Sequence, residues 1–296
     1  MAGGKGSRLR PLTCDVPKPM VPLANRPMME YIVELLSNQG FTEILVTSCY
    51  LTDQIENHFG DGARFGLDIK YVVEEEPLGT AGSVKNAEAY LDDTFLVVSG
   101  DALTDFDLNR AVEFHREKGA IATLVLTRVS SPLEYGITII DESGAVRRFL
   151  EKPAWGEVFS DTVNTGIYVL EPEIFEYYRA GVPFDFSKNL FPLLLSRRRP
   201  VYGYVACGYW SDVGNLDQYR QAHYDALDSK VRVNLPGRTV GDGVRVGEDA
   251  VIHPTARLIP PVILGNGVHV EQGAEIGPFT VLGDETIVGR GSSLRR

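Results

Sequence analysis

A six-residue repeat near the carboxyl end constrains the fold of this chain more than any other feature. Nine aliphatic residues recur at a strict spacing of six, and a small or β-branched residue follows each of them by four positions. A hexapeptide period builds parallel β-helices, in which each coil buries its aliphatic side chains against the next, and three hexads per coil leave room for about three coils. A flexible glycine-rich tail, the alternative, would show no register. The aliphatic positions are Val240, Val246, Ile252, Leu258, Leu264, Val270, Ile276, Leu282 and Val288.

The composition changes sharply where the repeat begins. Residues 1–229 hold 27 of the 28 aromatic residues, whereas residues 230–296 hold one, Phe279, together with 11 of the 30 glycines. We therefore predict two domains, residues 1–229 and 230–296. The repeat of the second resembles the left-handed hexapeptide β-helix, a domain that usually positions or oligomerises an enzyme or is itself an acyltransferase.

The first domain alternates strand and helix patterns. Alternation of this kind predicts an α/β fold with a mostly parallel sheet covered by helices on both faces. In such sheets ligands bind at the carboxyl ends of the strands, so the strand-to-helix loops are the places to look for chemistry. Apolar runs predict strands at 43–48, 68–73, 94–99 and 120–128, and helical patterns lie at 28–36, 80–90, 107–118 and 215–227.

Charge and composition exclude several classes of function. The net charge of −11 argues against a nucleic-acid surface. No uninterrupted apolar run approaches 18 residues, so we expect no membrane span. The first residues do not form a basic segment followed by an apolar one, so the sequence does not indicate a secretory signal. The three cysteines are scattered without metal-ligand spacing, which is typical of a reduced compartment, and we expect a cytoplasmic location.

The amino-terminal loop is the first candidate site. Gly3, Gly4 and Gly6 would let backbone N–H groups approach an anion closely, and residues 1–29 carry five basic side chains but one acid. This pattern predicts a polyphosphate site, with a disordered basic terminus as the alternative. Lys18 lies between two prolines that fix its backbone, which suits a point charge at a phosphate. Taken alone, Lys18 is more typical of a solvated side chain in a proline-rich loop.

Three further loops carry polar groups after apolar runs. Asp101 and Asp212 each follow such a run, and two carboxylates beside phosphates would suit Mg²⁺ if the fold brings them together. Each of them alone is more typical of a turn or a helix cap. The segment 74–83 could present backbone groups to a base, although Thr80 or Ser83 could equally be only a helix cap. Glu151, with its neighbour Lys152 and with Asn164, could bind a sugar phosphate, or could form only a surface ion pair.

Together these segments resemble the sugar-1-phosphate nucleotidyltransferase family over nearly the whole chain and in the family's order. Residues 3–13 resemble its signature loop, and 17–20, 100–101, 151–153 and 210–214 resemble further signatures. Residues 75–82 most resemble mannose-1-phosphate guanylyltransferases, and residues 99–105 and 161–166 resemble the bacterial branch of these. That branch often carries a phosphomannomutase-like domain after the β-helix, which we do not expect within residues 1–296.

The resemblance implies a reaction and a set of roles. A sugar 1-phosphate would attack the α-phosphorus of a nucleoside triphosphate, and pyrophosphate would leave, in a Mg²⁺-dependent step. GTP and mannose 1-phosphate are the expected substrates. The implied catalytic residues are Arg8, Lys18, Asp101 and Asp212, with both aspartates on the metal; the implied nucleotide-binding residues are Ala2, Gly3, Gly4, Gly6, Ser7, Glu76, Gly79, Thr80 and Gly100; the implied sugar-phosphate-binding residues are Gly136, Glu151, Lys152 and Asn164.

Some expectations concern the ends of the chain and the alternatives. In the resembling family a buried strand precedes the glycine-rich loop, so we expect that first strand to be missing before Met1 and the β-helix to be truncated. We also expect a homo-oligomer. The alternatives are a glucose-1-phosphate uridylyl- or thymidylyltransferase, a non-catalytic nucleotide-sugar sensor and, on the repeat alone, an acyltransferase.

Overall fold

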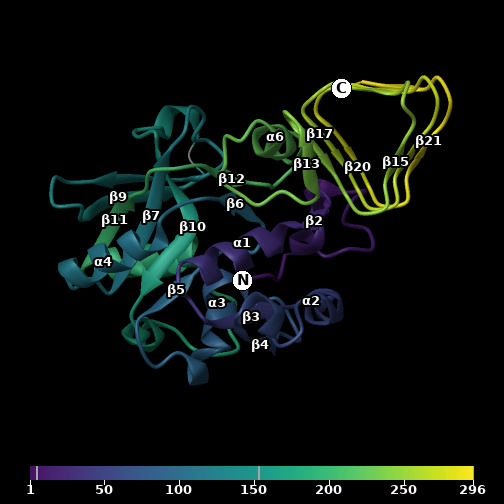
Figure 1. Ribbon diagram of the computed structural model, residues 1–296. Helices are drawn as coiled ribbons and strands as arrows, with labels where there is room; N and C mark the ends of the chain where they lie inside the picture. Colours follow the sequence, from purple (N-terminus) through teal and green to yellow (C-terminus); the bar gives the residue numbers. More distant parts are fainter. Residues whose placement is uncertain (5, 153, 296) are drawn as a thin grey trace.

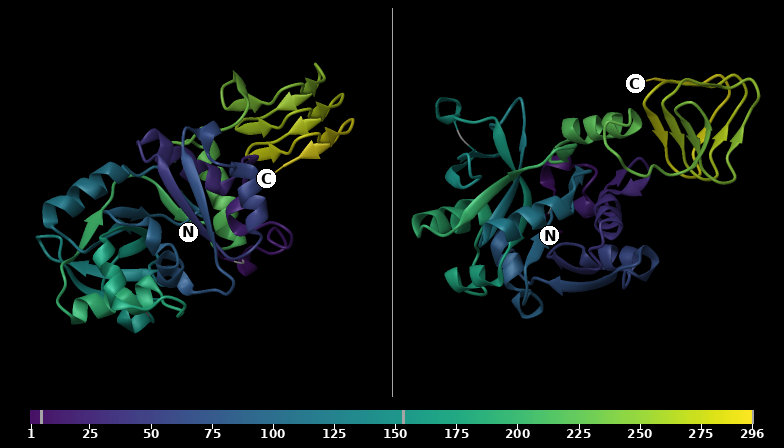
Figure 2. Two further views of the ribbon diagram at one scale, coloured as in Figure 1. Left: turned by 90° about the horizontal axis from the view of Figure 1, so that it is seen from below. Right: turned by 60° about the vertical axis from the view of Figure 1, so that its left-hand side comes forward.

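The chain folds into two bodies that lie side by side (Figure 1). The computed structural model describes residues 1–4, 6–152 and 154–295. An α/β region extends to the end of α6 (Leu216–Leu227), and a β-helix runs from β13 (Arg238–Gly241) to β22 (Ser293–Leu294). Two further views show the β-helix projecting from one end of the α/β region (Figure 2). Within the described ranges no helix is both long enough and apolar enough to cross a bilayer.

The helices of the α/β region follow local signals in the sequence. Asp107 caps α4 by accepting the N–H of Arg110 at 3.2 Å, and Asn215 caps α6 by accepting the N–H of Gln218 at 2.9 Å. The helix predicted over 80–90 is only partly correct, because α3 ends at Lys85 and a separate 3₁₀ turn follows at Glu88–Tyr90. The other helices are α1 (Met28–Asn38), α2 (Thr52–Phe59), α3 (Gly79–Lys85), α4 (Leu108–Lys118) and α5 (Phe191–Ser196).

The main sheet is organised around β10 (Thr162–Leu170). This strand pairs antiparallel with β5 (Phe95–Val97), β7 (Ala122–Arg128) and β8 (Gly136–Ile140), and β11 (Val201–Val205) extends the sheet by pairing in parallel with β7. The α/β class is confirmed, with antiparallel strands around β10 that the alternating pattern does not predict. The remaining strands are β1 (Pro22–Leu23), β2 (Arg26–Pro27), β3 (Glu43–Ser48), β4 (Asp68–Val73), β6 (Ala102–Thr104), β9 (Val146–Glu151) and β12 (Trp210–Asp212).

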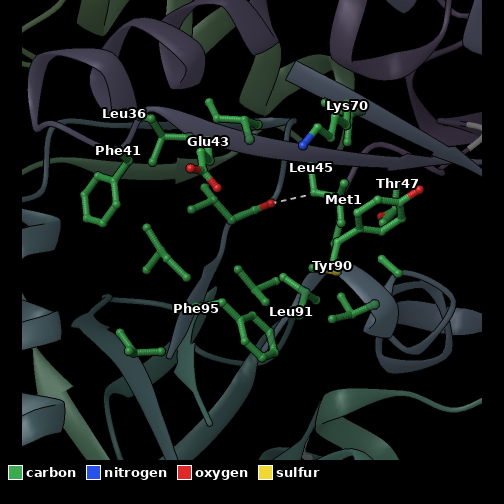
Figure 3. Close-up of a pocket in the computed structure, with 18 of the residues that line it drawn as sticks. Met1, Leu36, Phe41, Glu43, Leu45, Thr47, Lys70, Tyr90, Leu91 and Phe95 are labelled. Atoms are coloured by element: carbon green, nitrogen blue, oxygen red, sulfur yellow. Dashed lines mark hydrogen bonds between the residues drawn. The ribbon is translucent and has the colours of Figure 1, made fainter. Parts of the chain in front are cut away.

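A cavity separates the parallel pair β3–β4 from β5. The main chain of Met1 and Ala2 bridges one end of this gap, since Met1 donates to the Val98 carbonyl at 2.9 Å and Ala2 donates to the Thr47 carbonyl at 2.7 Å. Beyond Met1 the gap is a cavity of about 480 Å³. Its walls are largely apolar, and Figure 3 shows Leu36, Phe41, Leu45, Leu91 and Phe95 around it. Within the described ranges, the two strands that flank the cavity do not pair with each other.

The β-helix follows the hexapeptide register. Val244, Val262 and Thr280 occupy equivalent positions on successive strands, so one coil is eighteen residues, or three hexads. The predicted left-handed parallel β-helix is confirmed, and aliphatic side chains fill its interior. Val240 is an exception, because β13 turns back antiparallel to β14 and leaves this side chain 47% exposed. The remaining strands are β14 (Val244–Val246), β15 (Val251–Ile252), β16 (Arg257–Leu258), β17 (Val262–Leu264), β18 (His269–Val270), β19 (Glu275–Ile276), β20 (Thr280–Leu282) and β21 (Ile287–Val288).

Candidate active site

Two carboxylates that lie 111 positions apart in the sequence converge on one lysine. Asp212 ends β12, which pairs antiparallel with β6 so that Asp212 lies opposite Ala102, the residue after Asp101. The Lys18 ammonium contacts Asp101 Oδ2 and lies 3.7 Å from Asp212 Oδ1. The structure therefore brings together the three side chains whose proximity the sequence could not establish.

The pKa values of the two carboxylates shift in opposite directions, although both groups are buried. Burial opposes ionisation of Asp101, but Lys18 and a hydrogen bond from the Ser99 hydroxyl lower its pKa below the ordinary value. Burial and the neighbouring Asp101 charge raise the pKa of Asp212, although Lys18 and Arg8 partly offset this. The single positive charge of Lys18 therefore does not fully offset the repulsion between the two carboxylates.

This cluster fits a divalent cation whose other ligands come from elsewhere. Two carboxylates facing one point are oxygen donors of the kind that Mg²⁺ accepts, with phosphate oxygens and waters as the remaining ligands. The described residues contain no group of three or more His, Cys, Asp or Glu side chains arranged to hold a metal by themselves. The raised pKa of Asp212 supports the fit, because an additional positive charge would relieve the repulsion from Asp101.

The glycine-rich loop lies directly against Lys18. Gly6 has φ +60°, and a Cβ there would lie 3.0 Å from Lys18 Cβ and from the Thr13 methyl group, so a larger residue would displace the lysine. Thr13 donates to the Gly6 carbonyl at 2.8 Å and closes the loop. Leu9 is fully buried and anchors the following 3₁₀ turn.

The other predicted residues of this loop occupy varied environments. Ala2 is buried, Gly3 is half-buried, and Gly4, Ser7 and Arg8 are exposed. A Cβ added at Gly214 would lie 3.2 Å from an Arg8 guanidinium nitrogen, so this cation reaches the segment that follows Asp212. Gly100 donates its N–H to the Met1 carbonyl at 2.9 Å, which ties the Asp101 turn to the chain start. Lys5, another basic residue of the predicted loop, lies outside the described residues.

The segment predicted to face the base is folded around Glu74, which the sequence analysis did not single out. Glu74 is 6% exposed; its carboxylate accepts the Leu78 N–H at 3.1 Å and the hydroxyl proton of Ser83. Gly79 has φ +73°, and a Cβ there would lie 2.9 Å from the Phe184 carbonyl oxygen, so glycine is required. Glu76 is exposed on the same loop.

Thr80 is held by a distant segment. Its hydroxyl donates to Asp185 Oδ1 at 3.2 Å and accepts the Phe186 N–H at 3.0 Å. Thr80 therefore links the segment predicted to face the base to residues 185–186, and its side chain does not cap α3. The sequence gives no short-range signal for this contact, because the two partners lie more than 100 positions apart.

The predicted sugar-phosphate residues form one wall. Gly136 on β8 is the register partner of Glu151 on β9, and a Cβ at Gly136 would lie 2.7 Å from the Glu151 carboxylate. Asn164 on β10 donates to the Tyr168 hydroxyl at 2.9 Å and to the Ser187 hydroxyl at 3.2 Å. Burial raises the pKa of Glu151, although Lys152 and Lys188 partly offset it.

This wall adjoins the carboxylate pair through aromatic packing. The ring of Tyr135, next to Gly136, lies 5.3 Å from the ring of Trp210, two residues before Asp212. Lys152 adopts φ +47° and donates its N–H to the Tyr135 carbonyl at 3.1 Å. The glycine-rich loop and the predicted sugar-phosphate residues thus adjoin the Lys18–carboxylate cluster, whereas the predicted base residues contact residues 184–186, next to Ser187. Ser99, Ser187 and Asp185 are residues at these contacts that the sequence analysis missed.

An α/β region with this arrangement, followed by a hexapeptide β-helix, defines an enzyme of the nucleotidyl-transferring class. The chain belongs to the nucleotidyl transferase family, whose model matches residues 1–229, and a model for the bacterial transferase hexapeptide (six repeats) matches residues 243–278. The combined comparisons support a sugar-1-phosphate nucleotidyltransferase activity.

Relatives named for two different reactions are similar to this chain. A UTP–glucose-1-phosphate uridylyltransferase of Synechocystis sp. is 41% identical over 83% of this chain and 68% of its own length. A mannose-1-phosphate guanylyltransferase of Mycobacterium tuberculosis is 37% identical over 85% of this chain and 72% of its own length. Among solved structures, HddC from Yersinia pseudotuberculosis is 28% identical and superposes with a TM-score of 0.64 over 75% of this chain and 95% of its own.

Proposed function

We propose that this chain transfers a guanylyl group from GTP to mannose 1-phosphate, which yields GDP-mannose and pyrophosphate. The observation that carries the nucleotidyl-transfer step is the Lys18 ammonium, held between Asp101 and Asp212 beside the glycine-rich loop. The choice of guanine and mannose is supported by the relatives named mannose-1-phosphate guanylyltransferases and by a structure of HddC complexed with GMP-PN.

In the proposed mechanism the chain acts by positioning and charge stabilisation. An oxygen of the sugar phosphate attacks the α-phosphorus in line, the bond to the β-phosphate oxygen breaks, and pyrophosphate leaves with the electron pair. Lys18 stabilises the charge that develops on the α-phosphate, and Arg8 neutralises the phosphates of the leaving group. Backbone N–H groups of Gly3, Gly4, Gly6 and Ser7 cradle the triphosphate, and the buried Ala2 anchors the start of this loop through its N–H bond to the Thr47 carbonyl.

The remaining proposed roles follow the three walls of the site. Asp101 and Asp212 would hold Mg²⁺, which when bound neutralises phosphate oxygens. The loop with Glu76, Gly79 and Thr80 would face the base, and Gly100 would let the nucleotide approach the sheet edge. The sugar phosphate would lie against Gly136, Glu151, Lys152 and Asn164.

One alternative substrate pair has a specific observation in its favour. The 41% identical relative from Synechocystis is named a UTP–glucose-1-phosphate uridylyltransferase, so uridylyl transfer to glucose 1-phosphate is the second candidate. Thymidylyl transfer, a non-catalytic sensor and a β-helix acyltransferase have weaker support. Assembly into a homo-oligomer and a cytoplasmic location remain predictions.

Pyrophosphate release distinguishes these candidates. GTP, UTP, dTTP and ATP would each be combined with mannose 1-phosphate and with glucose 1-phosphate, in the presence of Mg²⁺. We expect the highest kcat/KM for GTP with mannose 1-phosphate. A preference for UTP with glucose 1-phosphate would replace the guanylyl assignment, and nucleotide binding without turnover of any pair by folded protein would favour the sensor. Lys18→Gln should abolish turnover, whereas Lys118→Gln, which removes a charge from α4, should not.

A further inference from the structure

One outer face of the β-helix is buried, while another is exposed. On the sheet β14–β17–β20, Arg245, Ile263 and Val281 form an outward column, and Ile263 is only 1% exposed. On the sheet β15–β18–β21 the equivalent outward residues are Val251, His269 and Ile287; all three are exposed, Val251 by 57% and Ile287 by 69%. The same kind of aliphatic side chain is therefore covered on one face and free on the other.

The hairpin β1–β2 and helix α6 cover the buried face (Figure 1). Asn25 at the hairpin tip donates its side-chain N–H to the Leu282 carbonyl at 2.7 Å, and the ring of Phe279 packs 5.1 Å from that of Tyr224 on α6. The apolar cluster at this contact includes Val21, Leu23, Ala24, Leu103, Val213, Ala222, Ala226, Val231 and Ile263, with Phe279 and Val281 packed against it.

The hairpin is fixed from the other side by α6. Ala24 and Asn25 both have positive φ, at 49° and 66°, so the tip is a tight turn with little freedom. The Ala24 N–H donates to His223 Nε2 at 3.1 Å, while His223 Nδ1 lies 3.1 Å from the Tyr219 carbonyl. The tip is thus clamped between an imidazole of α6 and a carbonyl of the β-helix.

The same cluster reaches both sides of the Lys18–carboxylate site. Val21 is fully buried in it and donates its N–H to the Lys18 carbonyl at 3.2 Å. Val213 is also fully buried in it and directly follows Asp212. A displacement of the β-helix face would loosen the backbone next to this lysine and this carboxylate. A misplacement of about 1 Å at groups that contact the reacting atoms can cost about 100-fold in rate.

We propose that the β-helix face formed by Ile263, Phe279, Val281 and the Leu282 carbonyl is a positioning element of the active site, which sets the placement of Lys18 and Asp212. The β-helix then contributes to turnover within a single chain, in addition to any role in assembly. This inference rests on the proposed function for its kinetic consequences, but its structural consequence can be measured without turnover.

The test replaces one isoleucine on the buried face and one on the exposed face of the β-helix by lysine. Ile263→Lys places an ammonium in the buried contact, and Ile287→Lys is the matched control on the exposed face. We expect Ile263→Lys to lower kcat at least tenfold and to raise the Mg²⁺ concentration for half-maximal activity several-fold, with KM for the nucleotide within about twofold. In Ile287→Lys, kcat, the Mg²⁺ concentration for half-maximal activity and KM should each stay within twofold of the native values. The conservative variant Ile263→Val should keep native turnover.

Hydrogen exchange separates failure of this inference from failure of the proposed function. Amides of residues 18–25 and 212–214 should exchange faster in Ile263→Lys than in Ile287→Lys, whichever substrates the enzyme accepts. Equal exchange with equal kcat would overturn the positioning role. If Ile263→Lys does not fold, Asn25→Gly serves instead, because glycine tolerates the positive φ and removes only the bond to Leu282; a kcat and an exchange pattern both unchanged in this variant would also overturn it.

Discussion

The β-helix and the α/β region differ in how completely their strands pair with neighbouring strands. Strands of the β-helix pair with their counterparts one coil away, and the aliphatic side chains form one interior cluster. In the α/β region a cavity of about 480 Å³ separates β3 from β5, and the buried polar groups include Lys18, Glu74 and Asp105. The repeat thus provides a regular scaffold, whereas the region with the chemistry holds buried charged groups.

The largest effect expected from this division is on activity. Asp101→Asn keeps the size of the side chain but removes the charge that faces Lys18, so kcat/KM should fall at least about 100-fold. Thermal unfolding should show that the fold persists. Asp217→Asn on α6, where the side chain is 89% exposed, is the matched control and should stay within about twofold. Unchanged turnover in Asp101→Asn would contradict the proposed metal-binding role.

The second effect is on stability and should be confined to the β-helix interior. Leu264 is 1% exposed in the interior cluster, so Leu264→Ala should lower the free energy of unfolding by about 2–5 kcal/mol. Ile287→Ala, on the exposed face of the same domain, should change it by less than about 0.5 kcal/mol. Denaturant titration of both variants measures the difference, and equal losses would show that the interior is not the source of stability.

The two regions also differ in what could be predicted from the sequence. The β-helix follows from a repeat in which each residue's neighbour lies at a fixed spacing, and only Val240, where β13 reverses direction, departs from it. In the α/β region the loops were found because glycines, prolines and acids mark the ends of apolar runs. The juxtaposition of Lys18, Asp101 and Asp212 depended on the resemblance, because proximity across about 200 positions leaves no local pattern.

Residues that support the site were missed for the same reason. Ser187 accepts the Asn164 amide and Asp185 accepts the Thr80 hydroxyl. Gly181 and Pro183 precede them, but this segment does not follow an apolar strand pattern as the predicted loops do. Glu74 lies in the predicted base-facing segment without a signal of its own, and only the fold shows that its carboxylate turns inward onto Leu78 and Ser83. Local patterns thus identify groups that face a ligand more readily than groups that hold those groups in place.

The smallest predicted effect concerns the gap in the α/β region. Burial lowers the pKa of the Met1 ammonium from 8.0 to about 6, although Asp101 and Glu74 oppose the shift. Between pH 6 and 8 the unfolded chain therefore binds a proton that the folded chain does not, so stability should rise with pH over this window. The rise should be at most about 3 kcal/mol, since one pKa unit corresponds to about 1.4 kcal/mol. Unfolding titrations at pH 6 and pH 8 measure it.

Changing the group on the Met1 nitrogen tests whether burial of this nitrogen beside the gap causes the rise of stability with pH. Acetylation removes the titrating charge, so the acetylated chain should lose this part of the pH dependence. A five-residue extension rich in valine would in addition place apolar side chains and ladder hydrogen bonds between β3 and β5, whereas a serine–glycine extension of equal length removes the charge alone. Slower hydrogen exchange in β3 and β5 is expected only for the valine-rich extension. Equal exchange with both extensions would show that the cavity does not accept a strand, and the contrast between the two regions would then reduce to their buried charges.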